Sequence, residues 1–194
     1  KRSFVAAMQQ GQHVAISAER FCSMLQPELG ALRYTLTALT DDLTIELKPF
    51  LDGGVTNEDS NWDDAFWKTH DLSSNAQGEA VIHCETEKSG FQAAFGMTSK
   101  VGKLKNNALH PLEVTSHGAS NSKAHCTFTT KLERGEEVVL EKYVGIFSSL
   151  QEQTQAIVTR AQASSREASV RGFEQLKADH TKAWSKIWNR GDIE

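Results

Sequence analysis

The sequence predicts a mainly β protein, an antiparallel β-sandwich followed by C-terminal α-helices. Between residues 13 and 149, short segments alternate apolar and polar side chains with a period of two, which is typical of half-buried strands. Turn residues separate these segments, and no helical pattern alternates with them, so a doubly wound sheet is not indicated. After residue 149 the apolar spacing changes to that of a helix.

The first three predicted strands cover residues 13–22, 31–39 and 43–50. In the second and third of them, every other residue is apolar and the residues between are polar or charged. Only a short turn containing Asp41 and Asp42 separates these two strands. We therefore expect them to pair with each other as an antiparallel hairpin.

Residues 55–79 show no regular period. This segment is polar and acidic, and it carries Trp62, Phe66 and Trp67. We expect a long surface loop with one helical turn around residues 63–68, because long loops on a β body run over the surface.

The second half of the β region repeats the strand pattern. Strands are predicted at residues 80–86, 91–98, 112–116 (weakly), 123–132 and 137–149. The last of these is the strongest, because it is rich in β-branched and aromatic residues. Residues 99–107 and 117–122 are expected to be loops, and residues 134–136 a tight turn.

Gly172 is expected to separate two helices, the second of which begins at Phe173. The second helix carries an apolar stripe made of Phe173, Leu176, His180, Trp184, Ile187 and Trp188. Two of the chain's 4 Trp lie on this stripe, so we expect it to be buried against a partner domain. Packing is the simpler interpretation of His180 and the two tryptophans, ahead of catalysis or sugar stacking.

Composition excludes several classes of function. The formal net charge is -4, which argues against nucleic acid as the main partner, and no apolar run is long enough to span a membrane. The 3 Cys are far apart, which favours free thiols and a cytoplasmic location, with the periplasm as the alternative. No nucleotide motif and no metal-ligand spacing is present, so we expect no cofactor and no metal.

Five segments in order resemble the N-terminal domain of glycoside hydrolase family 65. They are SAERFCSM, ALRYTLTAL, ELKPFLDGGVTN, LERGEEVVLEKYVGIFSS and HTKAWSKIWNRGDIE. Each motif alone is modest, but together they cover most of the chain in the family's order and spacing. The family holds maltose, trehalose and kojibiose phosphorylases and related trehalases.

The resemblance implies a galactose-mutarotase-like sandwich at residues 1–149 and a helical linker at residues 150–194. The linker would lead to an (α/α)6 catalytic barrel that this chain does not contain. The chain begins at Lys1 without a Met, so we expect a piece of a longer protein whose sandwich is incomplete at its N-terminal side.

The family's catalytic and phosphate-binding residues lie in the barrel, so the resemblance implies no catalytic residue here. We expect the interface with the barrel to contain Phe173, His180, Trp184, Trp188 and Asp192. Loops of the sandwich approach the active-site mouth in this family, and residues 57–70 are the candidate for such a loop. Its expected carbohydrate contacts are Trp62, Trp67 and His70. The simpler interpretation is a solvated acidic loop that its tryptophans pin to the sheet.

Two functions of different classes follow. The first is a non-catalytic domain of an enzyme that cleaves an α-linked glucose disaccharide by inverting phosphorolysis or hydrolysis. The barrel would bind the disaccharide and phosphate. A homodimer is a further expectation. The second is a free-standing carbohydrate-binding β-sandwich, and a purely structural interaction domain is a weaker third. Titration of the isolated chain with glucose, maltose and trehalose separates the first two.

Overall fold

The computed structural model describes residues 1–8, 11–56, 66–106, 108–150 and 154–191. Those residues form strands followed by two helices. The strands are β1 (Arg2–Ala7), β2 (His13–Cys22), β3 (Leu29–Ala38), β4 (Leu43–Leu47), β5 (Phe50–Asp52), β6 (Trp67–Ser74), β7 (Glu79–Thr86), β8 (Gln92–Lys105), β9 (Ala108–Pro111), β10 (Ser116–Ser120), β11 (Lys123–Leu132) and β12 (Glu137–Ser148). The helices are α1 (Thr154–Arg171) and α2 (Phe173–Gly191).

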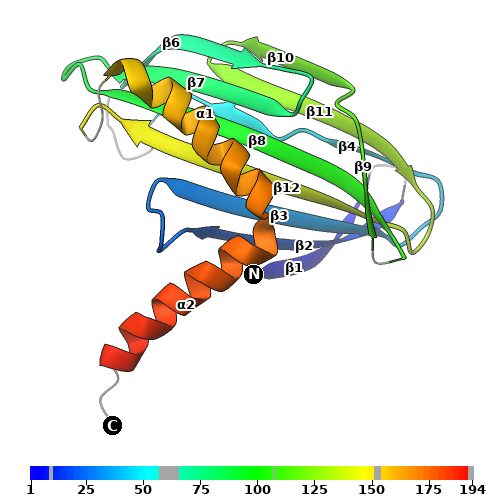
Figure 1. The fold of residues 1–194 in the computed structure, drawn as a ribbon. Helices are drawn as coiled ribbons and strands as arrows, with labels where there is room; N and C mark the ends of the chain where they lie inside the picture. The colour runs from blue at the N-terminus through cyan, green and yellow to red at the C-terminus, as the bar shows by residue number, and fades with distance from the viewer. Residues whose placement is uncertain (9–10, 57–65, 107, 151–153, 192–194) are drawn as a thin grey trace.

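The strands form two antiparallel sheets (Figure 1). The large sheet has the order β1-β2-β3-β12-β8-β7-β6, and β9 also pairs with β8. The small sheet has the order β10-β11-β4, and β5 also pairs with β11. The last strand of the chain, β12, lies between β3 and β8 and so joins the two halves of the large sheet. The predicted fold class, mainly antiparallel β with C-terminal helices, is confirmed.

The small sheet covers one face of the large sheet and encloses most of the apolar core. The largest cluster in this layer contains Val14, Leu36, Ala38, Leu43, Ile45, Val101, Cys126, Phe128, Leu132, Val138 and Leu140. Burial of each Val, Leu, Ile or Phe side chain contributes about 1.5–3 kcal/mol relative to exposure. The predicted inward face of residues 43–47 is correct, because Leu43 and Ile45 are buried in this cluster.

β12 is apolar along most of its length because both of its faces are covered. Val138 and Leu140 point toward the small sheet, where they join its core cluster. Tyr143 and Phe147 point to the other face of the large sheet and pack against the helices. A strand buried on both faces cannot show a clean polar alternation, which explains the near-continuous run of apolar residues in this segment.

α1 lies across the face of the large sheet that the small sheet leaves open (Figure 1). Gly96 of β8 and Gly145 of β12 are directly paired, and Ala161 of α1 sits on them. A Cβ atom at either glycine would lie 2.4 Å from the Ala161 carbonyl oxygen. The two glycines therefore form a seat, and their missing side chains let the helix approach the sheet closely.

Gly172 ends α1 as predicted. Its φ of 82° is a left-handed conformation that glycine adopts without a steric cost, and its N–H donates to the Ala168 carbonyl oxygen at 3.0 Å. α2 then begins at Phe173 in a new direction (Figure 1). The tight turn at residues 134–136 is also present, with Gly135 at a φ of 84°.

The predicted hairpin between residues 31–39 and 43–50 is wrong. β3 pairs with β2 and β12 in the large sheet, whereas β4 pairs with β11 in the small sheet. The chain crosses between the two sheets at this turn, where Asp42 has a φ of 53°. The alternation correctly predicted which side chains are buried, but a period of two does not say which strand is the neighbour.

Three segments that were predicted as loops contain strand. Residues 99–105 continue β8, residues 116–120 form β10, and the long loop ends where β6 begins at Trp67. Conversely, residues 112–115 are not a strand. β1 and β9 were not predicted at all. These strands lie at edges or carry small and polar residues, so their sequences lack the apolar alternation that marks a half-buried strand.

Within the described residues, no helix combines the length and the apolarity that a membrane crossing requires.

The glycine seat makes a prediction about stability. Gly145→Ala should lower the free energy of unfolding by about 1–3 kcal/mol, the usual cost of overpacking, because the added methyl group meets the backbone of α1. Gly30→Ala is the matched control, since a Cβ atom there would meet only carbonyl oxygens at 4.0 Å. Chemical denaturation of both variants measures the difference. Equal stabilities of the two variants would contradict the claim that α1 packs directly on Gly145.

Candidate functional site

The first two turns of α2 are anchored in the body of the protein. Phe173 and Leu176 are 1% and 2% exposed, and they pack with Leu29, Ala31 and Tyr143 of the large sheet. These two residues occupy the beginning of the predicted apolar stripe. The stripe is therefore buried at its N-terminal end by this chain itself.

Arg33 of β3 clamps the start of α2 to the sheet. Its Nε and Nη2 donate to Glu141 Oε1 of β12 at 3.0 and 2.6 Å, and its Nη1 donates to Glu174 of α2. Its guanidinium lies 4.3 Å from the centre of the Phe173 ring, within range of a cation–π contact. Burial disfavours the charge, but the hydrogen bonds to the two carboxylates outweigh it and raise the pKa of Arg33.

Tyr143 also holds Glu141, the carboxylate that Arg33 contacts. Its side chain is fully buried, and its hydroxyl donates to Glu141 Oε2 at 2.5 Å. Burial and the neighbouring carboxylate both raise the pKa of the Tyr143 hydroxyl, so it stays protonated as a donor. Glu141 thus accepts from both Arg33 and Tyr143, which fixes its position at the foot of α2.

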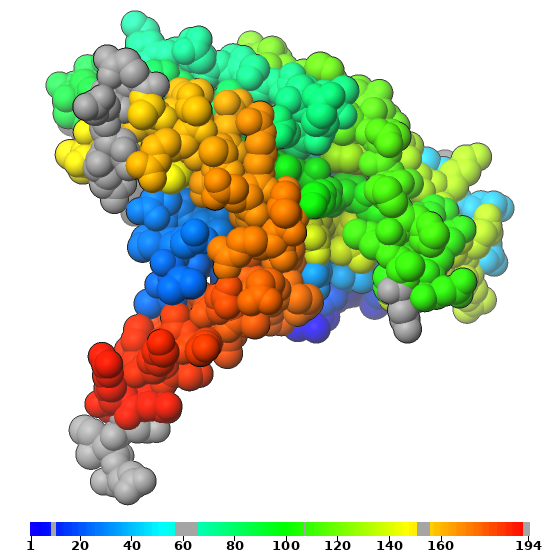
Figure 2. Space-filling model, in the orientation of Figure 1, coloured from blue at the N-terminus to red at the C-terminus, as the bar shows by residue number. Residues whose placement is uncertain are grey.

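The second half of α2 extends away from the sheets (Figures 1 and 2). His180 is the last residue of the stripe with a firm contact to the body: its ring lies 4.8 Å from the ring of Phe21, and its Nδ1 accepts from the Met24 N–H at 3.3 Å. Beyond it, Trp184 is 37% exposed and Trp188 is 64% exposed. The two indoles stack on each other at 6.1 Å.

The outer aromatic face, which we define as Trp184, Ile187 and Trp188, therefore stands in solvent. Ile187 is 48% exposed, so all three of its apolar side chains are accessible. Scattered single apolar residues on a surface are ordinary, but a contiguous aromatic row on a projecting helix is typical of an interaction surface. Of the five residues predicted at an interface, four lie on this helix in one line, and Asp192 lies outside the described residues.

The structure separates the predicted carbohydrate contacts. Trp62 lies outside the described residues. Trp67 is half-buried and packs toward the small sheet, against the cluster that contains Ile82 and Cys84. His70 points to the opposite face of the large sheet, where its Nε2 lies 2.9 Å from Glu85 Oε2. The sequence analysis missed this because it assigned residues 67–70 to a loop, whereas in a strand side chains three residues apart leave opposite faces.

His70 belongs to a polar network on the outer face of β6, β7 and β8. Gln92 links its other members: its Nε2 donates to Glu85 Oε2 at 3.0 Å, and its Oε1 is 2.9 Å from His83 Nε2. The rings of His70 and His83 are 5.4 Å apart. Across the described part of the chain, no group of three or more His, Cys, Asp or Glu side chains has the geometry to hold a metal ion.

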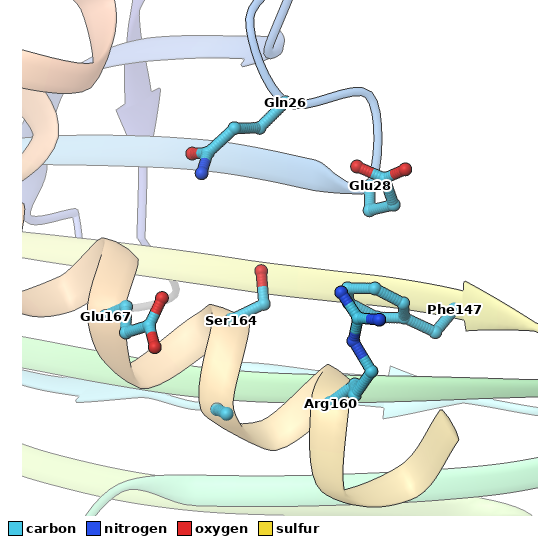
Figure 3. Close-up of a pocket in the computed structure, with 7 residues that line it drawn as sticks. Gln26, Glu28, Phe147, Arg160, Ser164 and Glu167 are labelled. Atoms are coloured by element: carbon cyan, nitrogen blue, oxygen red, sulfur yellow. The ribbon is translucent and has the colours of Figure 1, made fainter. Parts of the chain in front are cut away.

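A pocket of about 260 Å³ lies between α1, the end of β12 and the turn from β2 to β3 (Figure 3). Gln26 and Glu28 enter it from the turn, whereas Arg160 and Glu167 enter it from α1. The Arg160 guanidinium lies 5.0 Å from the centre of the Phe147 ring. None of these residues was predicted as a site. The pocket marks the junction of helix and turn, and it contains no nucleophile held by a base.

Sequence reasoning also missed the residues that hold α2 in place. Arg33, Phe21 and Glu141 lie on strands far away in the sequence, and they are ordinary alternating strand residues there. Lys177 of α2 donates to Glu19 of β2 at 2.5 Å in the same way. Only the pairing of β2, β3 and β12 brings these residues together, so no local pattern could have found them.

The family model described as glycosyl hydrolase family 65, N-terminal domain, matches residues 1–187. The maltose phosphorylase of Bacillus subtilis (strain 168) is 27% identical over 195 residues, which is 100% of this chain and 24% of that protein. An uncharacterized glycosyl hydrolase of Mycobacterium tuberculosis is 24% identical over 200 residues, which is 95% of this chain and 14% of that protein.

The fold also has a close match among solved structures. A structure assigned as a kojibiose phosphorylase from the human microbiome superposes with a TM-score of 0.80 at 17% identity. The superposition covers 96% of this chain and 23% of the other. At this identity it shows the fold alone. The chain thus spans about a quarter, or less, of the length of the relatives that it matches.

The ion pair between Glu19 and Lys177 predicts a pH dependence. The hydrogen bond from Lys177 lowers the pKa of Glu19, although burial opposes this shift. The stability that this carboxylate contributes is therefore fully present above its ordinary pKa of 4.5, and it is lost as pH falls through the lower folded-state pKa.

Glu19→Gln removes that contribution. We expect the variant to melt at a lower temperature than the wild type at pH 7, and the difference to disappear as pH falls below 4.5. Thermal melts of both proteins across this range measure it. A difference that stays constant with pH would mean that the pair does not stabilise α2 through its charge.

Proposed function

The chain belongs to the N-terminal domain family of glycosyl hydrolase family 65, and we propose that it is the non-catalytic domain of a carbohydrate-active enzyme, docked to a catalytic barrel through α2. The observation that carries this proposal is the outer aromatic face of α2. The face continues a stripe whose first residues are already buried in this chain, so a second domain placed beside the helix would bury the rest.

The proposed division of the chain follows from this role. Residues 1–149 form the sandwich that supports the barrel, and residues 150–194 form the helical linker toward it. Two features support the division: α1 is seated on the sheet by glycines, and Arg33 fixes the start of α2. Because the start of this linker is fixed, the linker would place the following domain at a defined position relative to the sandwich.

The proposed substrate of the whole enzyme is an α-linked glucose disaccharide, cleaved with inversion by phosphate or by water. The name of one relative supports this class, since that protein is a maltose phosphorylase. In such a reaction, a carboxylic acid protonates the leaving oxygen while the acceptor attacks the anomeric carbon. The acid and the residues that bind the acceptor would belong to the barrel, so the reacting disaccharide and phosphate would bind in that domain.

The proposal also includes a role for this chain at the substrate entrance. It assigns Trp62, Trp67 and His70 to the rim of the active-site mouth. The half-exposed network of His70, His83 and Glu85 supports a polar rim on this face of the sheet. Trp67 supports it less, because that side chain packs toward the small sheet. A cytoplasmic location and a homodimer complete the proposal.

The docking role predicts an effect that depends on context. In the longer protein, Trp188→Ala should destabilise the docked domains by about 2 kcal/mol or more, as for a buried interface tryptophan. In the 194-residue chain, the same change should cost within about 0.5 kcal/mol, because the side chain is largely exposed there.

Lys182→Ala, on the exposed side of α2, is the matched control in both contexts. Thermal unfolding and disaccharide phosphorolysis of the longer protein provide the readouts. If Trp188→Ala has the same small effect in both contexts, the outer aromatic face is not the docking surface. Tight binding of glucose, maltose or trehalose by the 194-residue chain would instead favour the free-standing carbohydrate-binding module.

A further inference from the structure

A pocket of about 330 Å³ opens on the outer face of the small sheet, on the side away from the core. We call it the basic pocket, and its lining residues are Lys48, Phe50, Ser120, Asn121, Lys123 and His125. It lies apart from α2, because its residues come from β5, β10, β11 and the turns beside them. No residue in it was predicted as a site.

The register of the small sheet points the aromatic and basic side chains into the pocket together. Phe50 of β5 is directly paired with His125 of β11, so both side chains leave the same face of the sheet. The neighbouring pair, Leu51 and Ala124, points the other way and is buried in the core. Gly118 leaves room for the His125 ring, since a Cβ atom there would lie 2.9 Å from its Cε1.

The turn at the rim of the pocket is held in an unfavourable conformation. Asn121 and Ser122 have φ values of 49° and 61° without being glycine, and for Ser such a conformation costs about 1–2 kcal/mol. The Ser122 carbonyl oxygen accepts from the Gly53 N–H at 2.8 Å, and its Oγ accepts from Thr69 Oγ1 at 3.2 Å. These bonds fix the turn and keep the Asn121 side chain at the rim.

The pocket carries more positive charge than nearby carboxylates neutralise. Lys123 pairs with Asp52 at 3.1 Å. Within the described ranges, neither Lys48 nor Lys142 has a carboxylate within 4.0 Å. Lys142 comes from β12 of the other sheet, and its Nζ donates to the Phe50 carbonyl oxygen at 2.5 Å and lies 5.7 Å from the Phe50 ring. Lys48 lines the pocket, so an anion bound there would supply the counter-charge that this ammonium group lacks.

The titration of His125 is consistent with positive charge around the pocket. Burial, followed by the charges of Lys48 and His117, lowers the pKa of His125. The imidazole therefore lies in a positive electrostatic environment, although the chain as a whole has a net charge of -4.

We propose that the basic pocket binds a sugar phosphate, with the phosphate between Lys48, Lys123 and His125 and the sugar ring against Phe50. Lysine side chains are common ligands of phosphate groups, and a cationic cleft concentrates anions. Phe50 is 49% exposed, so part of its side chain is accessible to a sugar ring beside the ammonium groups of Lys123 and Lys142, which lie 5.9 and 5.7 Å from the ring centre. Ser120 and Asn121 line the same pocket and would offer polar groups to the sugar hydroxyls. This site does not depend on the proposed docking of α2, since its lining residues belong to the small sheet and the turns beside it.

The test is isothermal titration of the 194-residue chain with glucose 1-phosphate and glucose 6-phosphate, beside inorganic phosphate and glucose as separate arms. We expect saturable binding of at least one hexose phosphate, weaker binding of inorganic phosphate and none of glucose. Lys48→Gln should weaken hexose phosphate binding about tenfold, and Phe50→Ala should abolish the preference over inorganic phosphate. Lys131→Gln, farther along β11, is the control and should change nothing.

A second readout separates binding in the pocket from unspecific charge effects. Imidazole resonances followed by NMR should show that the pKa of His125 rises when the ligand is present, because a phosphate beside the ring favours its charged form. The proposal is overturned if neither hexose phosphate binds at millimolar concentration, or if Lys48→Gln and Lys131→Gln bind equally. Equal binding of glucose and hexose phosphate would overturn it too, and would indicate a neutral carbohydrate site.

Discussion

The direct seating of α1 on the large sheet determines the position of everything that follows it in the chain. Gly96 and Gly145 lie side by side on β8 and β12, and the backbone of Ala161 rests on them. Gly172 then ends the helix in a conformation that turns the chain. Arg33, which bridges Glu141 and Glu174, fixes the direction in which α2 leaves. The sandwich therefore acts as a rigid base, and α2 projects from it at a defined place.

The buried faces of the strands were predictable, whereas their neighbours were not. Alternation of apolar residues identified the inward sides of β3, β4 and β11, because a half-buried strand must alternate. The same alternation cannot say that β3 and β4 belong to different sheets. The predicted strand ended too early at residue 98 because the second half of β8 carries three lysines. Val101 in that half is nevertheless buried in the main core cluster, and Lys100 and Lys103 donate to the Ser169 carbonyl oxygen and to Glu136.

In the candidate site too, the parts that are local in the sequence were predictable, whereas the parts assembled from distant strands were not. The stripe on α2 was found from helical spacing alone, since its residues are close together in the sequence. Its anchors, Arg33 and Phe21, lie more than a hundred residues earlier and required the sheet order to be known. Trp67 and His70 are near each other in sequence, but they leave opposite faces of β6. The basic pocket could not be predicted either, because only the pairing of β5 with β11 brings Phe50 and His125 together.

The most direct test of the central claim is amide hydrogen exchange of α2, measured in the 194-residue chain and in the proposed longer protein that includes the catalytic barrel. If α2 is anchored by the sandwich and completed by a second domain, the amides of residues 176–180 should be protected in both proteins. The amides of residues 184–190 should be protected only in the longer one. Equal exchange of these outer residues in both proteins would contradict the account.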